Sequence, residues 1–166
     1  MNKTTTIIGI SGASGAGKSV LARHLHKRLI GDHELGHAQI LHEDSYYRDR
    51  SDLSFEVREL INYDHPDALE HDLLVQHLQA LRNGESVEVP QYDYATHNRR
   101  AETAQLDPVP VIILEGILIL HDPRVREQLD LKIYVDVPLD TCLMRRLRRD
   151  TQQRSRTLDS VLAQYE

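Results

Sequence analysis

The sequence predicts an α/β fold in which a parallel β-sheet is flanked by helices. Three observations support this prediction. First, strand-like and helix-like segments alternate along the 166 residues, which is the pattern of a sheet built from crossover units. Second, the run Val111–Leu114 is apolar without interruption, as expected of a central parallel strand buried on both faces. Third, the glycine-rich stretch Gly9–Ser19 connects an apolar, β-branched run to a helical pattern.

The first elements are a strand, a helix and a second strand. Residues Thr6–Ile10 form the β-branched run that predicts the first strand. The helix begins near Gly17, and Gly31–Gly36 is a turn-rich break after it. Ala38–Leu41 predicts a second strand, which ends at the sequence HEDSYY.

An amphipathic helix is predicted from Pro66 to Leu81. Proline suits the first turn of a helix, because its missing N–H has no partner there. One face of this helix is apolar and consists of Leu69, Leu73, Leu74, Leu78 and Leu81. Gly84 follows as a stop signal.

A small hairpin and the last strands complete the sheet region. Val87–Val89 and Tyr92–Tyr94 alternate like the two strands of a hairpin, which we expect to be an insertion covering about residues 85–109. Leu131–Val135 predicts another strand of the parallel sheet. Asp140 then opens an arginine-rich helix.

Composition and length predict a single domain covering residues 1–166, with 40% apolar and 28% charged residues. No apolar run approaches the roughly 20 residues that span a bilayer, and the opening residues leave no room for a signal peptide before the first strand. Cys142 is the only cysteine, which favours a reducing cytoplasm. The net charge of −6 argues against bulk nucleic-acid binding. We therefore expect a cytoplasmic protein without nucleic-acid or membrane partners.

Positive charge is concentrated near the end of the sequence. From Arg145 to Arg156 there are six arginines and one acid, Asp150, so this segment carries +5 and the rest of the chain −11 (−6 minus 5). A basic segment on an acidic protein suggests a small polyanion as its target, although it can also be a solvated helix face. Arginines that close over phosphates favour the first interpretation once a nucleotide site is present.

The glycine-rich stretch has the P-loop pattern Gly12-x-x-x-x-Gly17-Lys18-Ser19. Its backbone N–H groups and the following helix N-terminus predict a cradle for the phosphates of a nucleoside triphosphate. Lys18 is expected to reach the β- and γ-phosphates, and the Ser19 hydroxyl to bind Mg²⁺. The predicted ATP-binding residues are Gly12, Ala13, Ser14, Gly15, Ala16, Gly17, Lys18 and Ser19.

Three acids follow predicted strands, namely Asp44, Glu115 and Asp136. Chemistry in an open parallel sheet gathers beyond the carboxyl ends of its strands. Glu115 is a candidate to complete the Mg²⁺ shell, directly or through water; the alternative is a turn carboxylate that caps the next segment. Asp44 is a candidate to orient an acceptor hydroxyl and take its proton, although an aspartate in this context is often a helix cap.

Seven sequence blocks resemble the uridine–cytidine kinases, within the wider uridine kinase and phosphoribulokinase group. In order they are GASGAGKS, EDSYY, NYDHPDAL, PQYDYATHNR, VIILEGIL, DTCLMRRLRRDTQQRSR and LAQYE. The resemblance implies a P-loop NTPase-type sheet with a hairpin insertion and an arginine-rich lid at about residues 140–158. It also implies transfer of phosphate from ATP or GTP, with Mg²⁺, to the 5′-hydroxyl of uridine or cytidine. A homotetramer is expected on the same grounds.

The resemblance assigns roles to individual residues. Asp44 is the expected catalytic base and a further candidate Mg²⁺ contact beside Ser19 and Glu115. The expected catalytic residues are Asp44, Lys18 and Arg149. The remaining expected residues bind the substrate. Tyr47 lies beside the catalytic base Asp44, and Asp64 and Arg146 contact the ribose. Tyr92 and His97 meet the edge of the pyrimidine, Tyr63 and Tyr94 form walls of its pocket, and Gln164 lies near the nucleobase. Arg154 and Arg156 belong with Arg149 to the lid.

Two alternatives remain open from the sequence. A phosphoribulokinase-like enzyme would act on a phosphorylated sugar, and it would want extra basic residues beside Asp64. A catalytically silent nucleotide-binding module is the other alternative, and an intact Asp44 speaks against it. Members of the group usually continue for about another strand and helix, so the chain is expected to lack a C-terminal strand and helix typical of the family.

Overall fold

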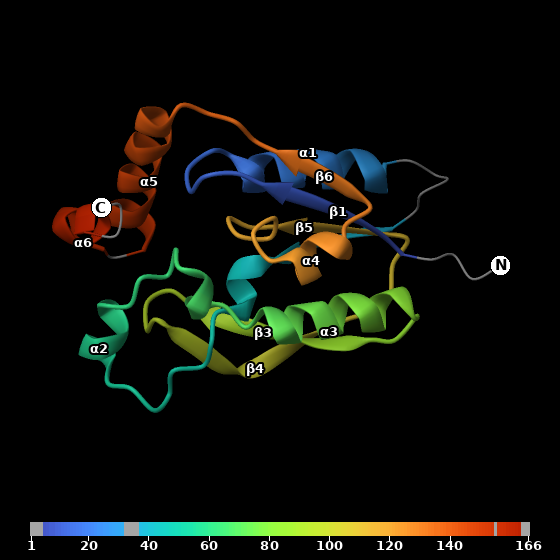
Figure 1. Cartoon of the computed structure of the whole chain (residues 1–166), viewed down its shortest axis with the longest axis horizontal. Helices are drawn as coiled ribbons and strands as arrows, with labels where there is room; N and C mark the ends of the chain where they lie inside the picture. Colours follow the sequence, from blue (N-terminus) through green and yellow to red (C-terminus); the bar gives the residue numbers. More distant parts are fainter. Residues whose placement is uncertain (1–4, 32–36, 155, 164–166) are drawn as a thin grey trace.

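The computed structural model describes residues 5–31, 37–154 and 156–163 (Figure 1). Its main sheet contains four strands, β1 (Thr6–Ser11), β2 (Ala38–His42), β5 (Val111–Glu115) and β6 (Leu131–Tyr134). A separate antiparallel hairpin contains β3 (Val87–Asp93) and β4 (Asn98–Leu106). The α-helices are α1 (Lys18–Ile30), α2 (Phe55–Glu59), α3 (His71–Arg82), α4 (Pro123–Glu127), α5 (Leu139–Gln153) and α6 (Leu158–Ala163), and the 3₁₀ turns are η1 (Glu43–Tyr46) and η2 (Pro66–Ala68).

The four strands of the main sheet are parallel and lie in the order β2-β5-β1-β6. All five residues of β5 are buried, and β5 lies between β2 and β1. The prediction of a buried central parallel strand is therefore confirmed. Because the strands run the same way, β1, β2 and β5 all end at one edge of the sheet, with Ser11, His42 and Glu115 as their last residues.

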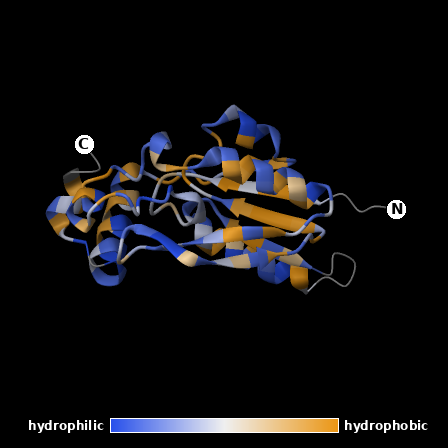
Figure 2. Cartoon of the chain, turned by 90° about the horizontal axis from the view of Figure 1, so that it is seen from below, coloured by the Kyte–Doolittle hydropathy of each residue, from blue (hydrophilic) through white to orange (hydrophobic). Residues whose placement is uncertain are grey.

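Two apolar layers cover the sheet. On one face, Ala22 of α1 packs with Ile8 and Ile113. On the other face, Leu78 of α3 packs with residues of β1 and β5 that alternate with the first set, such as Ile112. Figure 2 shows hydrophobic residues concentrated on the central strands. The period-two alternation of strand side chains explains why neighbouring residues serve opposite layers.

The predicted helix from Pro66 to Leu81 is wrong at its start. Pro66–Ala68 forms a 3₁₀ turn, and α3 begins only at His71. Leu69 between them is extended, with φ −102° and ψ 148°, and pairs with Tyr47 in an isolated β-bridge. This tertiary pairing interrupts a pattern that is locally helical.

The hairpin is present, but its strands differ from the prediction. Val87–Val89 and Tyr92 both belong to β3, whose register shifts between Pro90 and Tyr92. Its partner is β4, which runs over Asn98–Leu106 and is mostly exposed. An exposed polar strand has no apolar alternation to reveal it, and Pro90 cannot donate to the ladder.

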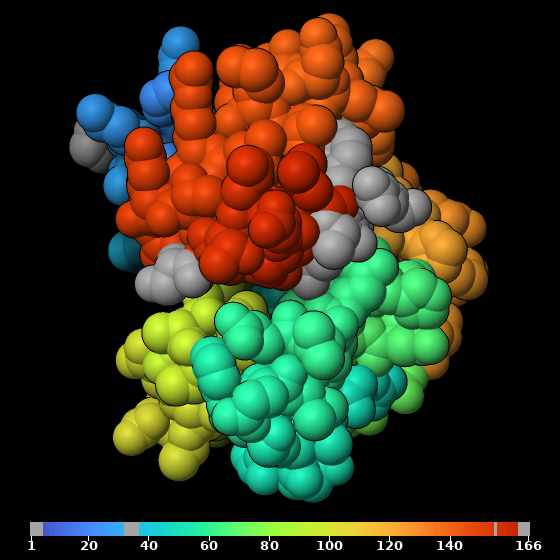
Figure 3. Space-filling model, turned by 90° about the vertical axis from the view of Figure 1, so that its left-hand side faces the viewer, coloured from blue at the N-terminus to red at the C-terminus, as the bar shows by residue number. Residues whose placement is uncertain are grey.

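The carboxyl ends of the sheet face α5, α6, α2 and the turn between β3 and β4 (Figure 1). Figure 3 views this end of the molecule, with α5 and α6 in red above and residues near α2 and the hairpin in green and yellow below. A site between these parts draws on segments far apart in the sequence.

Candidate active site

The P-loop leaves β1 and enters α1 through three glycines with positive φ. Gly12, Gly15 and Gly17 have φ values of 148°, 87° and 99°, which residues with a Cβ rarely adopt. A Cβ on Gly12 would lie 2.6 Å from the Val135 carbonyl oxygen, so only glycine lets the loop pass there. Helix α1 begins immediately afterwards at Lys18, which directs its N-terminus toward the loop.

Lys18 is held inside this loop. Its Nζ donates to the Ala13 carbonyl at 3.0 Å. Burial lowers the pKa of Lys18, and the nearby carboxylates of Glu115 and Asp44 oppose that effect. A buried ammonium with only a carbonyl acceptor has remaining donors for an anionic ligand.

Ser19 and Glu115 form a pair of oxygen ligands beside Lys18. The Ser19 hydroxyl donates to Glu115 Oε1 at 2.9 Å, and His42 Nδ1 lies 2.7 Å from the same oxygen. Burial would raise the pKa of Glu115, but the hydrogen bonds and charges of its neighbours, His42 above all, hold it below its usual value. An ionised carboxylate beside a hydroxyl fits Mg²⁺, which accepts one or two such ligands and completes its shell with phosphate and water.

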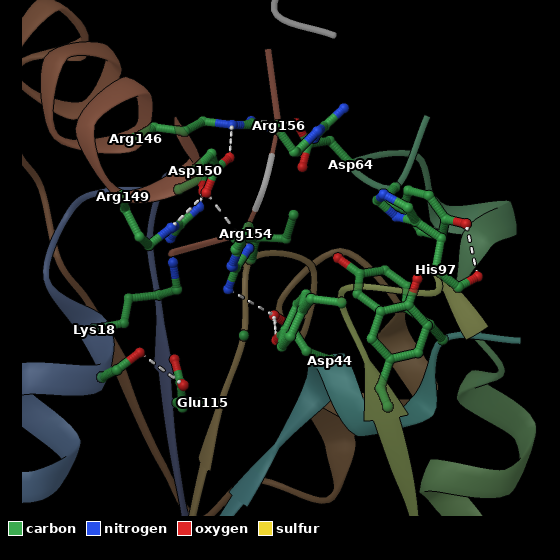
Figure 4. A pocket seen from close by; sticks show the side chains of 18 residues that line it. Lys18, Asp44, Asp64, His97, Glu115, Arg146, Arg149, Asp150, Arg154 and Arg156 are labelled. Atoms are coloured by element: carbon green, nitrogen blue, oxygen red, sulfur yellow. Dashed lines mark hydrogen bonds and ion pairs between the residues drawn. The ribbon is translucent and has the colours of Figure 1, made fainter. Parts of the chain in front are cut away.

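Asp44 lies in η1, directly after β2. Its Oδ2 accepts from the Tyr94 hydroxyl at 2.6 Å, and an Arg154 Nη2 lies 3.9 Å from the same oxygen. The Arg154 guanidinium also stacks over the Tyr94 ring at 4.0 Å. In Figure 4, Asp44 lies between the Lys18 side of the pocket and the aromatic side, within reach of both.

Five rings line the other side of the pocket. Tyr47 packs edge-on against Tyr63 at 5.2 Å between ring centroids and against Tyr92 at 4.9 Å. The His97 ring stacks on Tyr63 at 5.4 Å, and Tyr94 meets Tyr92 edge-on at 5.3 Å. These contacts place Tyr47, which follows η1, with residues from the loop before η2 and from the hairpin around one space, as a flat ring-shaped ligand requires.

Two polar groups in this aromatic box are available to a ligand. Among the described residues, the buried Tyr92 hydroxyl makes no hydrogen bond of good geometry, although it lies close to the Tyr63 hydroxyl, which donates to the Arg58 carbonyl at 3.0 Å. His97 has a positive φ of 50°, unusual for a residue other than glycine, and its carbonyl accepts from the Tyr63 hydroxyl at 3.3 Å. Burial lowers the pKa of His97, and the charge of Arg156 adds to this effect. A neutral imidazole can donate at one nitrogen and accept at the other.

The arginines of α5 are organised around Asp150, which is 1% exposed. Asp150 accepts from Arg149 Nε at 2.7 Å and lies 3.5 Å from Arg146 Nε and 3.8 Å from Arg154 Nη1. Arg146 also pairs with Asp64 across the pocket. The Arg149 guanidinium reaches the P-loop, where Nη2 donates to Ser14 Oγ at 3.1 Å. Figure 4 shows these side chains above Lys18.

Most of the predicted site residues share one pocket. Its lining includes Ser14, Lys18, Ser19, Asp44, Tyr47, Tyr63, Asp64, Tyr92, Tyr94, His97, Glu115, Arg146, Arg149, Arg154 and Arg156. The P-loop residues Gly15, Ala16 and Gly17 instead line an adjoining cleft between α1 and α5. Gly12 and Ala13 shape the loop behind Lys18, and Gln164 lies outside the described residues.

Several residues of the site are not evident from the sequence. Asp150, Gly116 and Ile117 also line the pocket, and His42 contacts Glu115. A lone acid four residues after Arg146 and four before Arg154 was a signal for Asp150, because such spacings bring helical side chains together. Gly116 and Ile117 line the pocket because the chain turns toward it after β5 ends at Glu115. No local sequence pattern predicts this turn.

Among residues 5–31, 37–154 and 156–163, no helix combines the length and apolar character that crossing a bilayer demands.

The chain is similar to known kinases in sequence and in fold. The sequence model of the Phosphoribulokinase / Uridine kinase family matches residues 7–166. Curated proteins named uridine kinase from Proteus mirabilis and Salmonella typhimurium are each 53% identical over 163 residues, which covers 96% of this chain and 75% of each relative. Among solved structures, a candidate fructose transport system kinase from Silicibacter sp. TM1040 has a TM-score of 0.78 at 26% identity, covering 97% of this chain and 79% of that one. A D-glycerate 3-kinase from Cryptococcus neoformans shares the fold, with a TM-score of 0.70 at 17% identity over 98% of this chain and 77% of that one.

Proposed function

Because this chain belongs to the phosphoribulokinase and uridine kinase family of kinases, we propose that it transfers the γ-phosphoryl group of ATP or GTP to the 5′-hydroxyl of uridine or cytidine. One observation carries this proposal. Asp44 lies in a single pocket that has the P-loop lysine at one side and the aromatic box at the other. A carboxylate between donor and acceptor sites is placed to act on the acceptor hydroxyl.

The acceptor side of the pocket suits a pyrimidine ribonucleoside. The aromatic rings of Tyr47, Tyr63 and Tyr92 offer walls for a flat base. Uracil and cytosine exchange donor and acceptor at one edge, so partners able to reverse roles are needed. The neutral His97 ring and the Tyr92 hydroxyl both have this property.

Asp64 and Arg146 suit the ribose. Their ion pair crosses from the loop before η2 to α5. The Asp64 carboxylate can accept hydrogen bonds from the 2′- and 3′-hydroxyls while Arg146 holds it in place. A nucleoside without the 2′-hydroxyl would leave that carboxylate short of a partner, which is how such sites discriminate.

The donor side is the P-loop and the adjoining cleft between α1 and α5. Lys18 and the loop N–H groups would hold the β- and γ-phosphates, and Arg149 would approach from α5. Ser19 and Glu115 would hold Mg²⁺, with Asp44 close enough to join through water. The ion would neutralise charge on the phosphates and help align them with the acceptor.

Asp44 then orients the 5′-hydroxyl and accepts its proton as the new P–O bond forms and the bond to the donor breaks. Tyr94 and Arg154 contact this carboxylate in the structure. We propose that Arg154 moves from Asp44 to the phosphoryl group when donor and acceptor are both bound. Arginines above the pocket also exclude water, which would otherwise compete as the acceptor.

The test is a coupled assay of nucleotide turnover with uridine, cytidine, adenosine, thymidine, ribulose 5-phosphate and no acceptor. We expect efficient turnover with uridine and cytidine alone. Efficient phosphorylation of adenosine would contradict the pyrimidine site, and turnover with ribulose 5-phosphate would favour a sugar kinase. No turnover with any acceptor, together with ATP binding, would favour a silent nucleotide-binding module.

We further propose that the enzyme serves pyrimidine salvage, forming UMP and CMP in the cytoplasm, and that it assembles as a homotetramer. Light scattering of the purified protein tests the assembly. A monomer at assay concentrations would contradict it without affecting the assignment of the reaction.

A further inference from the structure

Glu43 is a fully buried acid that the proposed reaction does not use. It directly precedes Asp44 and has 0% exposure. Both of its carboxylate oxygens are engaged. Oε1 lies 2.9 Å from His71 Nε2, and Oε2 accepts from the Leu118 backbone N–H at 2.9 Å. Burying a carboxylate is unfavourable unless such partners are present. We therefore asked what these two hydrogen bonds of Glu43 do for the neighbouring site.

The first partner connects Glu43 to the helices on the same face of the sheet. His71 opens α3 and is 6% exposed. Its Nδ1 lies 3.3 Å from Asp122 Oδ2. Asp122 is the N-cap of α4 and accepts from the Arg124 backbone N–H at 2.9 Å. The side chain of Glu43 is therefore held by a short chain of groups that ends at a helix cap.

The second partner connects Glu43 to the loop that follows the candidate Mg²⁺ ligand Glu115. Gly116 N donates to the Ile10 carbonyl at 3.2 Å, and Ser11 Oγ donates to the Ile117 carbonyl at 3.3 Å. This loop is thus fastened to the end of β1, where the P-loop begins. A Cβ on Gly116 would overlap the Glu43 carboxylate, so glycine is what permits the close approach.

The strands concerned are neighbours in the order β2-β5-β1. Each leads into one part of the site, since β2 is followed by Asp44, β5 ends at Glu115, and β1 enters the P-loop. From these contacts we infer that Glu43 is a positioning residue, which fixes Asp44 relative to Glu115 and the P-loop by fastening three adjacent strand ends together. The expected effect of Glu43 on kcat rests on the proposed function. Its physical basis is that reacting groups must be held to within a fraction of an ångström.

The test compares three substitutions by steady-state kinetics and thermal unfolding. Glu43→Ala removes both bonds. We expect kcat to fall by about tenfold to a hundredfold, because a displacement of ~1 Å at the reacting groups is enough for such a loss. The KM values for nucleotide and acceptor should change by less than about threefold, since neither binding site includes Glu43.

Glu43→Gln serves as the conservative variant. The glutamine oxygen can still accept from Leu118 N, and its amide can donate to His71 Nε2 when His71 carries its proton on the Asp122 side. We therefore expect Glu43→Gln to recover most of the lost kcat. A glutamine variant as impaired as the alanine variant would overturn the inference, because the charge rather than the fastening would then matter.

Asp130→Ala is the matched control. Asp130 also accepts from a backbone N–H of β1, that of Ile7 at 2.7 Å, and pairs with Arg82, but it lies at the opposite end of the sheet from Asp44. We expect this variant to lose stability with kcat unchanged. An equal fall in kcat in Asp130→Ala and Glu43→Ala would mean general destabilisation and would overturn the inference.

His71→Ala is the second route if Glu43→Ala does not fold. It removes one of the two partners, and we expect a smaller fall in kcat that is less than additive with Glu43→Ala where both can be made. The inference is overturned by an unchanged kcat in folded Glu43→Ala or, where Glu43→Ala does not fold, by an unchanged kcat in folded His71→Ala. All ratios are taken with whichever acceptor the unaltered enzyme phosphorylates, so failure with uridine would count against the proposed function alone.

Discussion

At the scale of single residues, the pocket is built from polar groups that contact each other. Asp44 is held by Tyr94 and approached by Arg154, and Lys18 donates to its own loop. These contacts place charged groups around the space in which phosphoryl transfer would occur, and Arg154 would exchange its contact with Asp44 for one with the phosphoryl group. Preorganised charge of this kind is the main source of catalysis in such reactions.

Asp44→Asn should lower kcat by roughly a hundredfold or more while nucleoside affinity persists, because asparagine keeps the shape and an acceptor oxygen but cannot take a proton. Steady-state kinetics with a separate binding measurement checks this. Asp52→Asn, an exposed neighbour in the chain, should behave like the unaltered enzyme. A loss confined to KM would make Asp44 a binding residue and place the base elsewhere.

His97 predicts a pH dependence of nucleoside binding. Burial, with the charge of Arg156, lowers the pKa of His97 from its usual 6.5, so the ring stays neutral in the folded protein at pH values where an exposed histidine would begin to gain a proton. The KM for uridine should therefore stay constant from pH 8 to 6.5 and rise only below the lowered pKa. The same shift makes folding stability fall as the pH drops below 6.5, because the unfolded chain then binds the proton more readily.

Measuring KM from pH 5 to 8 for the unaltered enzyme and for His97→Asn tests this expectation. The asparagine variant should bind uridine more weakly, and its profile should be flatter at acid pH. A profile that rises already above pH 6.5, or one that His97→Asn does not alter, would show that another group titrates.

At the scale of elements, α5 forms one wall of the site through a single buried acid. Asp150 gathers Arg146 and Arg149 of the helix with Arg154, which directly follows it, and Arg149 reaches the P-loop at Ser14. Gly15 permits this approach, because a Cβ there would overlap the Cys142 carbonyl of α5. A basic helix thus becomes an ordered set of donors, which is what a transferring phosphoryl group needs.

Arg149→Ala should depress kcat by about tenfold or more and should also lower the melting temperature by several degrees. The guanidinium is placed to contact the phosphates, and it also forms the shortest ion pair of the buried Asp150, so its loss leaves that carboxylate with weaker partners. Arg148→Ala, an exposed arginine on the same helix, is the control and should leave both quantities unchanged. If Arg149→Ala instead unfolds the protein and the folded fraction keeps full activity, the helix is structural.

At the scale of the whole molecule, the site lies between segments that are far apart in the sequence, from Ser14 to Arg156. Helix α1, which the P-loop enters, packs on one face of the sheet, whereas the hairpin and α3 lie on the other. A donor and an acceptor bound together would bridge these parts. Ligands that bind only the folded state stabilise it by mass action.

MgATP at about a hundred times its Kd should therefore add ~2.7 kcal/mol to the stability, which corresponds to a rise of several degrees in melting temperature. Chelating the metal with EDTA should remove much of this rise. Ser19→Ala should make the effect of EDTA on the melting temperature clearly smaller, because one of the two proposed Mg²⁺ ligands is gone while Glu115 remains. An EDTA effect of full size in Ser19→Ala would contradict that ligand assignment.

Local patterns determined much of this protein. Three features could be recognised within a few residues each. They are the glycine spacing of the P-loop, the uninterrupted apolar run of β5, and the acids Asp44 after β2 and Glu115 at the end of β5. Loop conformation and strand burial depend strongly on local sequence. Motif resemblance also predicted most residues that line the pocket, since those blocks are short and specific.

Only the tertiary structure decided the rest. Leu69 interrupts a helical pattern because it pairs with Tyr47. The residues of β4 are mostly exposed, and they form a strand because they pair with β3. Glu43 is an acid whose importance comes from partners far along the chain, namely His71 and the Leu118 backbone N–H. Hydrogen bonds across the sheet and between helices depend on distances that folding alone creates, and no local pattern in the sequence encodes them.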